Sequence, residues 1–173
     1  MTLERIGRIW ALVVRMFAWA GLLSLLALTL VTLADVAMRN GLGKPILGLN
    51  ELFGLFGVAS VGAFLPFALS SRQLLTVAFF GSILGERAGT ILNWFADICT
   101  LVFLLALLWS IRGYTSDVVT NGEATYLLGL ATGPWWIWVV ICLVVSTIAH
   151  ILTVTGIMTR DMLVPPRLGE DQS

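Results

Sequence analysis

The sequence predicts an all-α integral membrane protein with four transmembrane helices and a short interfacial amphipathic helix after the second. Hydrophobic residues make up 58% of the 173 residues, charged residues only 12%, and the mean hydropathy is +0.97. A soluble domain of this size lacks the interior to bury so much apolar surface. The 10 basic and 10 acidic residues cancel and fall mostly between long apolar stretches. This pattern favours membrane lipid as the surroundings and argues against nucleic acid as a partner.

The first expected span covers 12–37, around a charge-free run at 16–34. A bilayer core about 30 Å thick needs about 20 helical residues, which this run supplies. The run exceeds the roughly 7–15 apolar residues of a secretory signal, and no A-x-A cleavage site follows it. We therefore expect an uncleaved membrane span.

The second expected span covers 51–71 and contains the charge-free run 52–71. The next segment, 72–86, has charges at both ends and too few residues between them to cross a bilayer. It predicts an interfacial helix, with a loop that continues the second span as the alternative.

The third expected span, 89–111, contains Asp97, which costs about 2.5–3.5 kcal/mol at the centre of a membrane helix. The surrounding Leu, Ile, Val and Phe residues outweigh this cost. The fourth span, 134–158, lies in a charge-free run at 124–159. The remaining tail, 160–173, is polar at its end and proline-containing, which predicts disorder. All of these segments form one membrane domain, 1–173.

The basic residues predict that the N- and C-termini are cytoplasmic, because cytoplasmic loops carry an excess of Lys and Arg. In this orientation the inner side holds seven basic residues and the outer side three. The inner residues are Arg5, Arg8, Arg15, Arg72, Arg87, Arg160 and Arg167, and the outer ones are Arg39, Lys44 and Arg112. The expected outer loops are about 38–50 and 112–133.

Two acidic residues stand at the outer ends of the first two spans. Asp35 and Arg39 are four residues apart and share a helix face. They form either an ordinary ion pair at a helix end or a fixed point for a partner subunit. Glu51 lies in the first turn of the second span, where a carboxylate suits the helix dipole, and a contact with Arg39 or Lys44 is a second interpretation.

Asp97 and His150 are the ionisable residues placed deepest in the spans, and such residues commonly face other helices or water. Each lies about 12 Å from the inner end of its helix, and the two helices run antiparallel. We therefore hypothesise a contact between Asp97 and His150. The alternatives are a hydrogen bond from Asp97 to Asn93 and a His150 ring that faces a neighbouring carbonyl.

Residue patterns for catalysis or cofactor binding do not stand out. The one histidine cannot supply both axial ligands of a bis-histidine haem. The sequence displays no Ser-His-Asp set, no glycine-rich phosphate loop and no acidic metal cluster. We therefore expect no enzyme activity and no catalytic, cofactor-binding or metal site.

The order of several short motifs resembles the small, four-span membrane subunit of tripartite ATP-independent periplasmic (TRAP) transporters. The matching motifs, which extend over nearly the whole chain, are Asp35-Val-Ala-Met-Arg39, then Pro45 and Glu51, then Arg72-Gln-Leu-Leu-Thr-Val, and finally Thr125, Gly129 and Gly133-Pro134-Trp135. The resemblance implies a bacterial inner-membrane location and two partners, a large multi-span subunit and a periplasmic solute-binding protein.

The resemblance also implies a role for each of the two membrane subunits. The large subunit carries the organic acid together with sodium, and the small subunit packs against its scaffold to support symport. Asp35, Arg39, Glu51, Asp97 and His150 are then candidate structural or interface residues. The charged residues of the outer loops, Lys44, Arg112, Asp117 and Glu123 with Arg39, are candidates for docking the binding protein. Two alternatives are a stand-alone small four-helix transporter and the membrane anchor of a redox complex.

Overall fold

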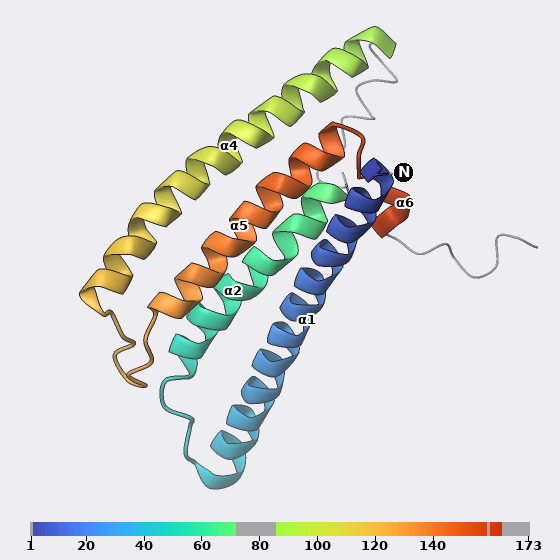
Figure 1. Cartoon of the computed structure of the whole chain (residues 1–173). Helices are drawn as coiled ribbons and strands as arrows, with labels where there is room; N and C mark the ends of the chain where they lie inside the picture. Colours follow the sequence, from blue (N-terminus) through green and yellow to red (C-terminus); the bar gives the residue numbers. More distant parts are fainter. Residues whose placement is uncertain (1, 72–85, 159, 164–173) are drawn as a thin grey trace, which may run out of the picture.

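A computed structural model describes residues 2–71, 86–158 and 160–163. In these ranges the chain is helical, and four helices are long and apolar enough to cross a membrane. The helices, labelled in Figure 1, are α1 (Thr2–Leu42), α2 (Leu49–Ser70), α4 (Glu86–Asn121), α5 (Gly133–Val154) and the short α6 (Arg160–Leu163). The predicted all-α fold with four transmembrane helices is confirmed.

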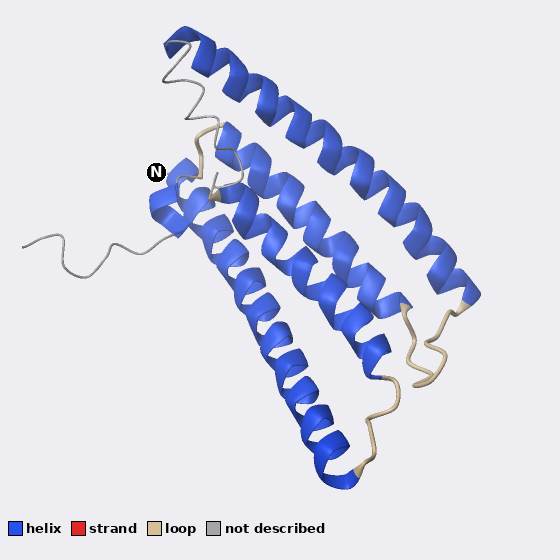
Figure 2. Ribbon diagram, turned by 180° about the vertical axis from the view of Figure 1, so that it is seen from behind, coloured by secondary structure: helices blue, strands red, loops and turns tan. Residues whose placement is uncertain are grey.

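The four long helices stand side by side in a single layer, in the order α1, α2, α5, α4 (Figures 1 and 2). The two central helices run parallel, and each edge helix runs antiparallel to its neighbour. In the most apolar stretch of α5, 44% of the residues are buried, against 28% in α2 and 6% in both α1 and α4. The buried core therefore follows α2 and α5, and the edge helices turn most of their surface outward.

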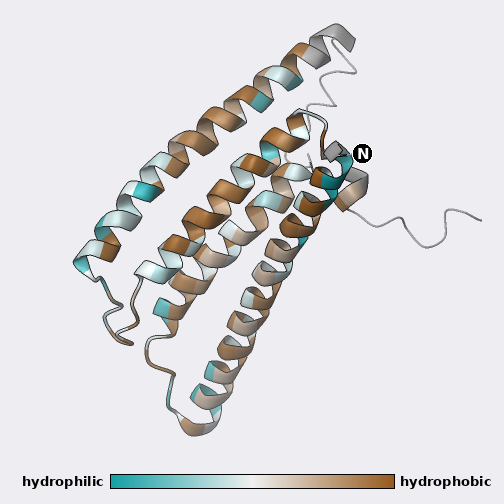
Figure 3. Ribbon diagram, viewed as in Figure 1, coloured by the Kyte–Doolittle hydropathy of each residue, from teal (hydrophilic) through white to brown (hydrophobic). Residues whose placement is uncertain are grey.

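Apolar residues cover the long helices, and polar residues lie mainly toward their ends (Figure 3). Many serine and threonine hydroxyls inside the helices donate to a carbonyl oxygen of the same helix, as Ser146 does to Cys142 at 2.7 Å and Thr147 to Leu143 at 2.9 Å. Such bonds satisfy a hydroxyl that faces no water. In the described ranges, every buried side-chain nitrogen or oxygen has a hydrogen-bond partner.

The helices begin and end at other residues than the expected spans. Membrane thickness sets the length of the apolar run within a helix, but the helix itself can continue beyond the membrane. α1 begins at Thr2, well before 12, and α4 continues to Asn121, past 111. The expectation of an outer loop at 112–133 is therefore wrong for its first part. α4 ends where Gly122 adopts a left-handed backbone with φ of 63°, a conformation that glycine accepts without strain.

The expectation of a disordered tail from 160 is wrong for residues 160–163, which form α6. Arg15 holds this short helix, because its Nε donates to the carbonyl of Leu163 at 2.8 Å and its Nη2 to that of Met162 at 2.6 Å. Leu163 and Met158 are also buried in an apolar cluster with α1 and α5. The expected interfacial segment 72–85 lies outside the described residues, and position 86 begins α4.

Candidate functional site

Two connections lie at the end of the layer opposite the start of α1 (Figure 1). One joins α1 to α2, and the other joins α4 to α5. The first spans residues 43–48 and the second 122–132. They touch at Gly48, which precedes α2 with φ of 81°, and a Cβ there would come within 2.6 Å of the Leu128 side chain. A glycine is required at this position by both its backbone conformation and its close neighbour.

Asp35 ties the first connection to α1. Asp35 is only 2% exposed, and each of its two carboxylate oxygens accepts a hydrogen bond. Oδ2 accepts from Arg39 Nη2 at 2.8 Å, and Oδ1 accepts from the backbone amide of Ile46 at 2.6 Å. Arg39 itself is 63% exposed, so its cation still faces the surroundings. Asp35 therefore has two roles: it forms an ion pair with Arg39, and it fixes the path of the loop by binding the Ile46 amide.

The second connection folds into a small hairpin, defined here as residues 123–132. The amide of Thr125 donates to the carbonyl of Leu130 at 2.9 Å, and the amide of Thr132 donates to that of Glu123 at 3.0 Å. An isolated antiparallel bridge joins Ala124 to Ala131 between these bonds. The hairpin thus has a defined shape and can carry side chains in fixed positions.

Glu51 fastens this hairpin to α2. Its Oε1 accepts from the amide of Leu127 at 2.7 Å and its Oε2 from the amide of Leu128 at 3.0 Å. Hydrogen bonds to an ionised carboxylate are stronger than those between neutral groups. The expected contact of Glu51 with Arg39 or Lys44 is not among the ion pairs of the described residues. The carboxylate therefore works as an anchor for backbone amides.

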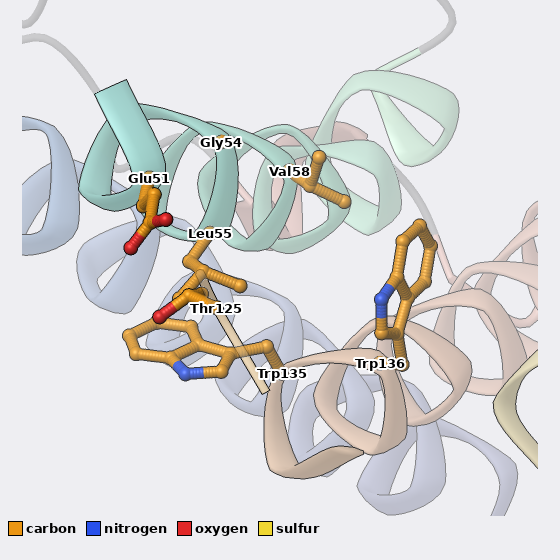
Figure 4. Close-up of a pocket in the computed structure, with 7 residues that line it drawn as sticks. All are labelled: Glu51, Gly54, Leu55, Val58, Thr125, Trp135 and Trp136. Atoms are coloured by element: carbon orange, nitrogen blue, oxygen red, sulfur yellow. The ribbon is translucent and has the colours of Figure 1, made fainter. Parts of the chain in front are cut away.

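A cavity of about 300 Å³ opens beside Glu51, where α2, the hairpin and the first turn of α5 meet (Figure 4). In Figure 4, Trp135 lies near Leu55 and Thr125, and the ring of Trp136 stands beside Val58. The cavity is lined by Glu51, Gly54, Leu55, Val58, Thr125, Trp135 and Trp136. One carboxylate, one hydroxyl and two indoles suit non-covalent binding of a partner more than bond-making chemistry.

Aromatic neighbours hold both indoles of this cavity in place. Trp135 packs against Phe56 with ring centroids 4.7 Å apart, and Trp136 packs edge-on against Tyr114 at 4.7 Å. Both pairs have the tilted or perpendicular geometry that aromatic rings prefer. Tyr114 lies in the part of α4 that continues past residue 111, the expected end of the third span. This additional helical segment therefore also supports the cavity.

The predicted docking residues are all exposed, and they are distributed over more than the loops. Lys44 lies in the first connection and Glu123 in the hairpin. Arg112 and Asp117 lie on α4, with Arg112 about 13 Å along the helix from Asn121. Exposed apolar residues accompany these charges, among them Leu47 at 77% and Tyr126 at 96% exposure. This end of the layer therefore offers a mixed charged and apolar surface.

Asp97 and His150 meet, but through an atom that we did not expect. His150 is 3% exposed, and its Nε2 lies 3.1 Å from the backbone carbonyl oxygen of Asp97. This geometry combines the hypothesised pair with the alternative of a histidine facing a carbonyl. The bond joins α5 to α4 close to the C-terminal end of α5, which is Val154.

Sequence reasoning missed the hairpin and its link to Glu51. The signals were present in Gly129, which adopts φ of 64° in the hairpin, and in a carboxylate one turn into a helix. It also missed the role of Arg15, which was counted only as an inner positive charge. In each case the bonding partner is a backbone group far away along the chain, and side-chain patterns do not reveal such partners.

Comparison with known proteins gives one family. The sequence model of the family described as tripartite ATP-independent periplasmic transporters, DctQ component, matches residues 28–160. This range includes the two connections, the hairpin and the cavity. Comparison with curated proteins and with solved structures returned no match.

Proposed function

Because the chain belongs to the DctQ component of the tripartite ATP-independent periplasmic transporters, we propose that it packs against the scaffold of a large translocating subunit. In this role it supports uptake of an organic acid that a periplasmic binding protein delivers, with sodium as the coupling ion. The chain itself is a multi-pass inner-membrane protein and a transporter component. Both termini are proposed to be cytoplasmic.

The single observation that carries this proposal is the one-layer arrangement of the helices. A helix bundle packs its helices around a shared core, whereas a single layer leaves two broad faces and two edges uncovered. The edge helices α1 and α4 are only 6% buried in their most apolar stretches. Such surface suits contact with lipid and with a larger membrane partner.

The hairpin end supplies a second element of the proposal, docking of the binding protein. Its charges are exposed and of both signs, and the hairpin and cavity are held rigidly by Glu51 and by aromatic pairs. Rigid surfaces bind partners at a lower entropic cost than mobile ones. In the proposed orientation this end faces the periplasm.

The proposal is tested by reconstitution. The tagged full-length chain is co-expressed with the large subunit of its transporter, and the pair is purified and placed in liposomes. We expect both chains to co-purify, and we expect organic-acid uptake only when both chains, the binding protein and an inward sodium gradient are present. Uptake by this chain alone, or full uptake by the large subunit without it, would contradict the proposal.

A further inference from the structure

A groove runs between α1 and α2 at the end of the layer that holds Arg15 and α6. Its volume is about 560 Å³. The groove is lined on α1 by Arg15, Ala18, Trp19 and Leu22, and on α2 by Phe64 and Phe67. It exists because Gly21 lets Phe64 approach α1 closely, while the small side chain of Ala18 leaves the space above them open.

The groove has one cation, at its end nearest α6. Arg15 is the last charged residue before the charge-free run 16–34, so its guanidinium marks the boundary of the apolar region. Two of its N–H groups bind the carbonyls of α6, and three of its five donors remain. Among the residues whose side chains the structure describes, no carboxylate lies at ion-pair distance from Arg15. Among those side chains, its positive charge therefore has no counter-charge at the level where lipid headgroups lie.

Trp19 is the second unusual residue of the groove. It lies one helical turn, about 6 Å, beyond Arg15 toward the membrane centre. Its side chain is 64% exposed. An indole at this depth has an apolar ring for acyl chains and an N–H donor for a polar group near the headgroups.

We infer that the α1–α2 groove is a binding site for an anionic phospholipid. The phosphate of the headgroup accepts hydrogen bonds from Arg15, and the indole N–H of Trp19 donates to the ester region one turn deeper. One acyl chain lies along Ala18 and Leu22 against Phe64 and Phe67. The distance from Arg15 to Leu22 is about 10 Å along the helix, which fits within one leaflet of a bilayer core about 30 Å thick.

Charge decides between a lipid and another apolar occupant. A purely apolar helix from a partner or from a second copy would fill the groove but would itself supply no anion for the Arg15 cation. An anionic headgroup supplies that charge, and the bidentate geometry of arginine suits phosphate oxygens. The bound lipid would also stabilise α6, because it holds Arg15 in the orientation that binds Met162 and Leu163.

The experiment is native mass spectrometry on the delipidated full-length chain in detergent, with phosphatidylglycerol or phosphatidylcholine of the same acyl chains. One cationic side chain beside an anionic headgroup corresponds to a preference of about fivefold, which we expect for phosphatidylglycerol. Ala18→Phe fills the groove yet keeps Arg15, and Arg15→Gln removes the cation. We expect both variants to lose the preference.

The matched control is Ala27→Phe, which adds the same ring on an exposed face of α1 outside the groove and should keep the preference. Circular dichroism verifies that each variant is helical, and Ala18→Phe remains informative if Arg15→Gln does not fold. Equal binding of the two lipids to the natural chain would overturn the inference. So would a preference that Ala18→Phe leaves unchanged, or one that disappears when the large subunit or a second copy is bound.

Discussion

Two carboxylates at the hairpin end of this protein, Asp35 and Glu51, bind backbone amides, and this explains why they are placed where they are. Asp35 holds the amide of Ile46, and Glu51 holds the amides of Leu127 and Leu128. Amides in a connection have no helical partner and must find another acceptor. An acidic side chain that projects from a rigid helix provides that acceptor and fixes the connection at the same time.

At this scale we predict the effect of Glu51→Gln. The amide group of glutamine replaces one acceptor oxygen with a donor, so one of the two hairpin amides loses its partner. We expect the midpoint of thermal unfolding to fall, because that amide is left without an acceptor. The measurement is unfolding in detergent micelles, and Glu123→Gln, an exposed carboxylate in the same hairpin, is the matched control. Equal stability of the two variants would show that Glu51 is no anchor.

The pair formed by Asp97 and His150 illustrates how far the sequence predicts a site. Because the rise per residue in a helix is constant, the equal depth of the two residues in antiparallel helices was enough to predict that they lie close together. The atom that His150 reaches is a backbone oxygen, and its choice depends on how α4 and α5 are rotated. Rotation is determined by packing of many side chains, which single residues in a sequence do not encode.

At the scale of elements, hydropathy predicts which residues lie in lipid but not where helices end. Each of the four helices that could cross a membrane overlaps one of the four predicted spans. Their ends depend instead on local backbone chemistry, as at Gly122 after α4 and Gly156 after α5, which adopt φ of 63° and 73°. α6 depends on Arg15, a partner more than a hundred residues earlier in the chain, so its sequence alone gave no sign of it.

The contact between α1 and the turn after α5 leads to a prediction about Gly7. This residue is buried, and a Cβ added there would collide with the backbone carbonyl oxygen of Ile157. We expect Gly7→Ala to lower the free energy of unfolding by about 1–3 kcal/mol, because backbone must shift to admit the methyl group.

Gly57→Ala is the control for this prediction. Gly57 also lies inside a helix, but no atom is near enough to meet its added Cβ. Alanine favours helix over glycine by up to about 1 kcal/mol, so this variant should be neutral or more stable. Thermal unfolding of both variants in the same detergent makes the comparison. A Gly7→Ala variant as stable as Gly57→Ala would mean that α1 does not approach the turn so closely.

At the scale of the whole molecule, the charges at the two ends of the layer have separate roles. We predict that neutralising all five outer residues, Arg39, Lys44, Arg112, Asp117 and Glu123, weakens binding-protein-dependent uptake. The expected effect is about a tenfold higher concentration of binding protein for half-maximal uptake, because charges at the rim of an interface steer association. Uptake at saturating binding protein should change less.

The matched control neutralises Glu4, Arg5 and Arg8, which are exposed at the opposite end of the layer. Uptake assays in reconstituted liposomes compare the two variants over a range of binding-protein concentrations and salt. We expect the control to keep the natural half-maximal concentration. If the outer variant keeps it as well, the hairpin end does not dock the binding protein.

The parallel pairing of α2 with α5 has a consequence for how the chain is assembled during synthesis. α1 with α2, and α4 with α5, are antiparallel neighbours joined by short connections, so each pair forms a helical hairpin that can enter the membrane as a unit. The central contact between α2 and α5 cannot form until the ribosome has released the second hairpin. The protein therefore enters the membrane as two helical hairpins, and its most buried surface forms only after the second hairpin has entered.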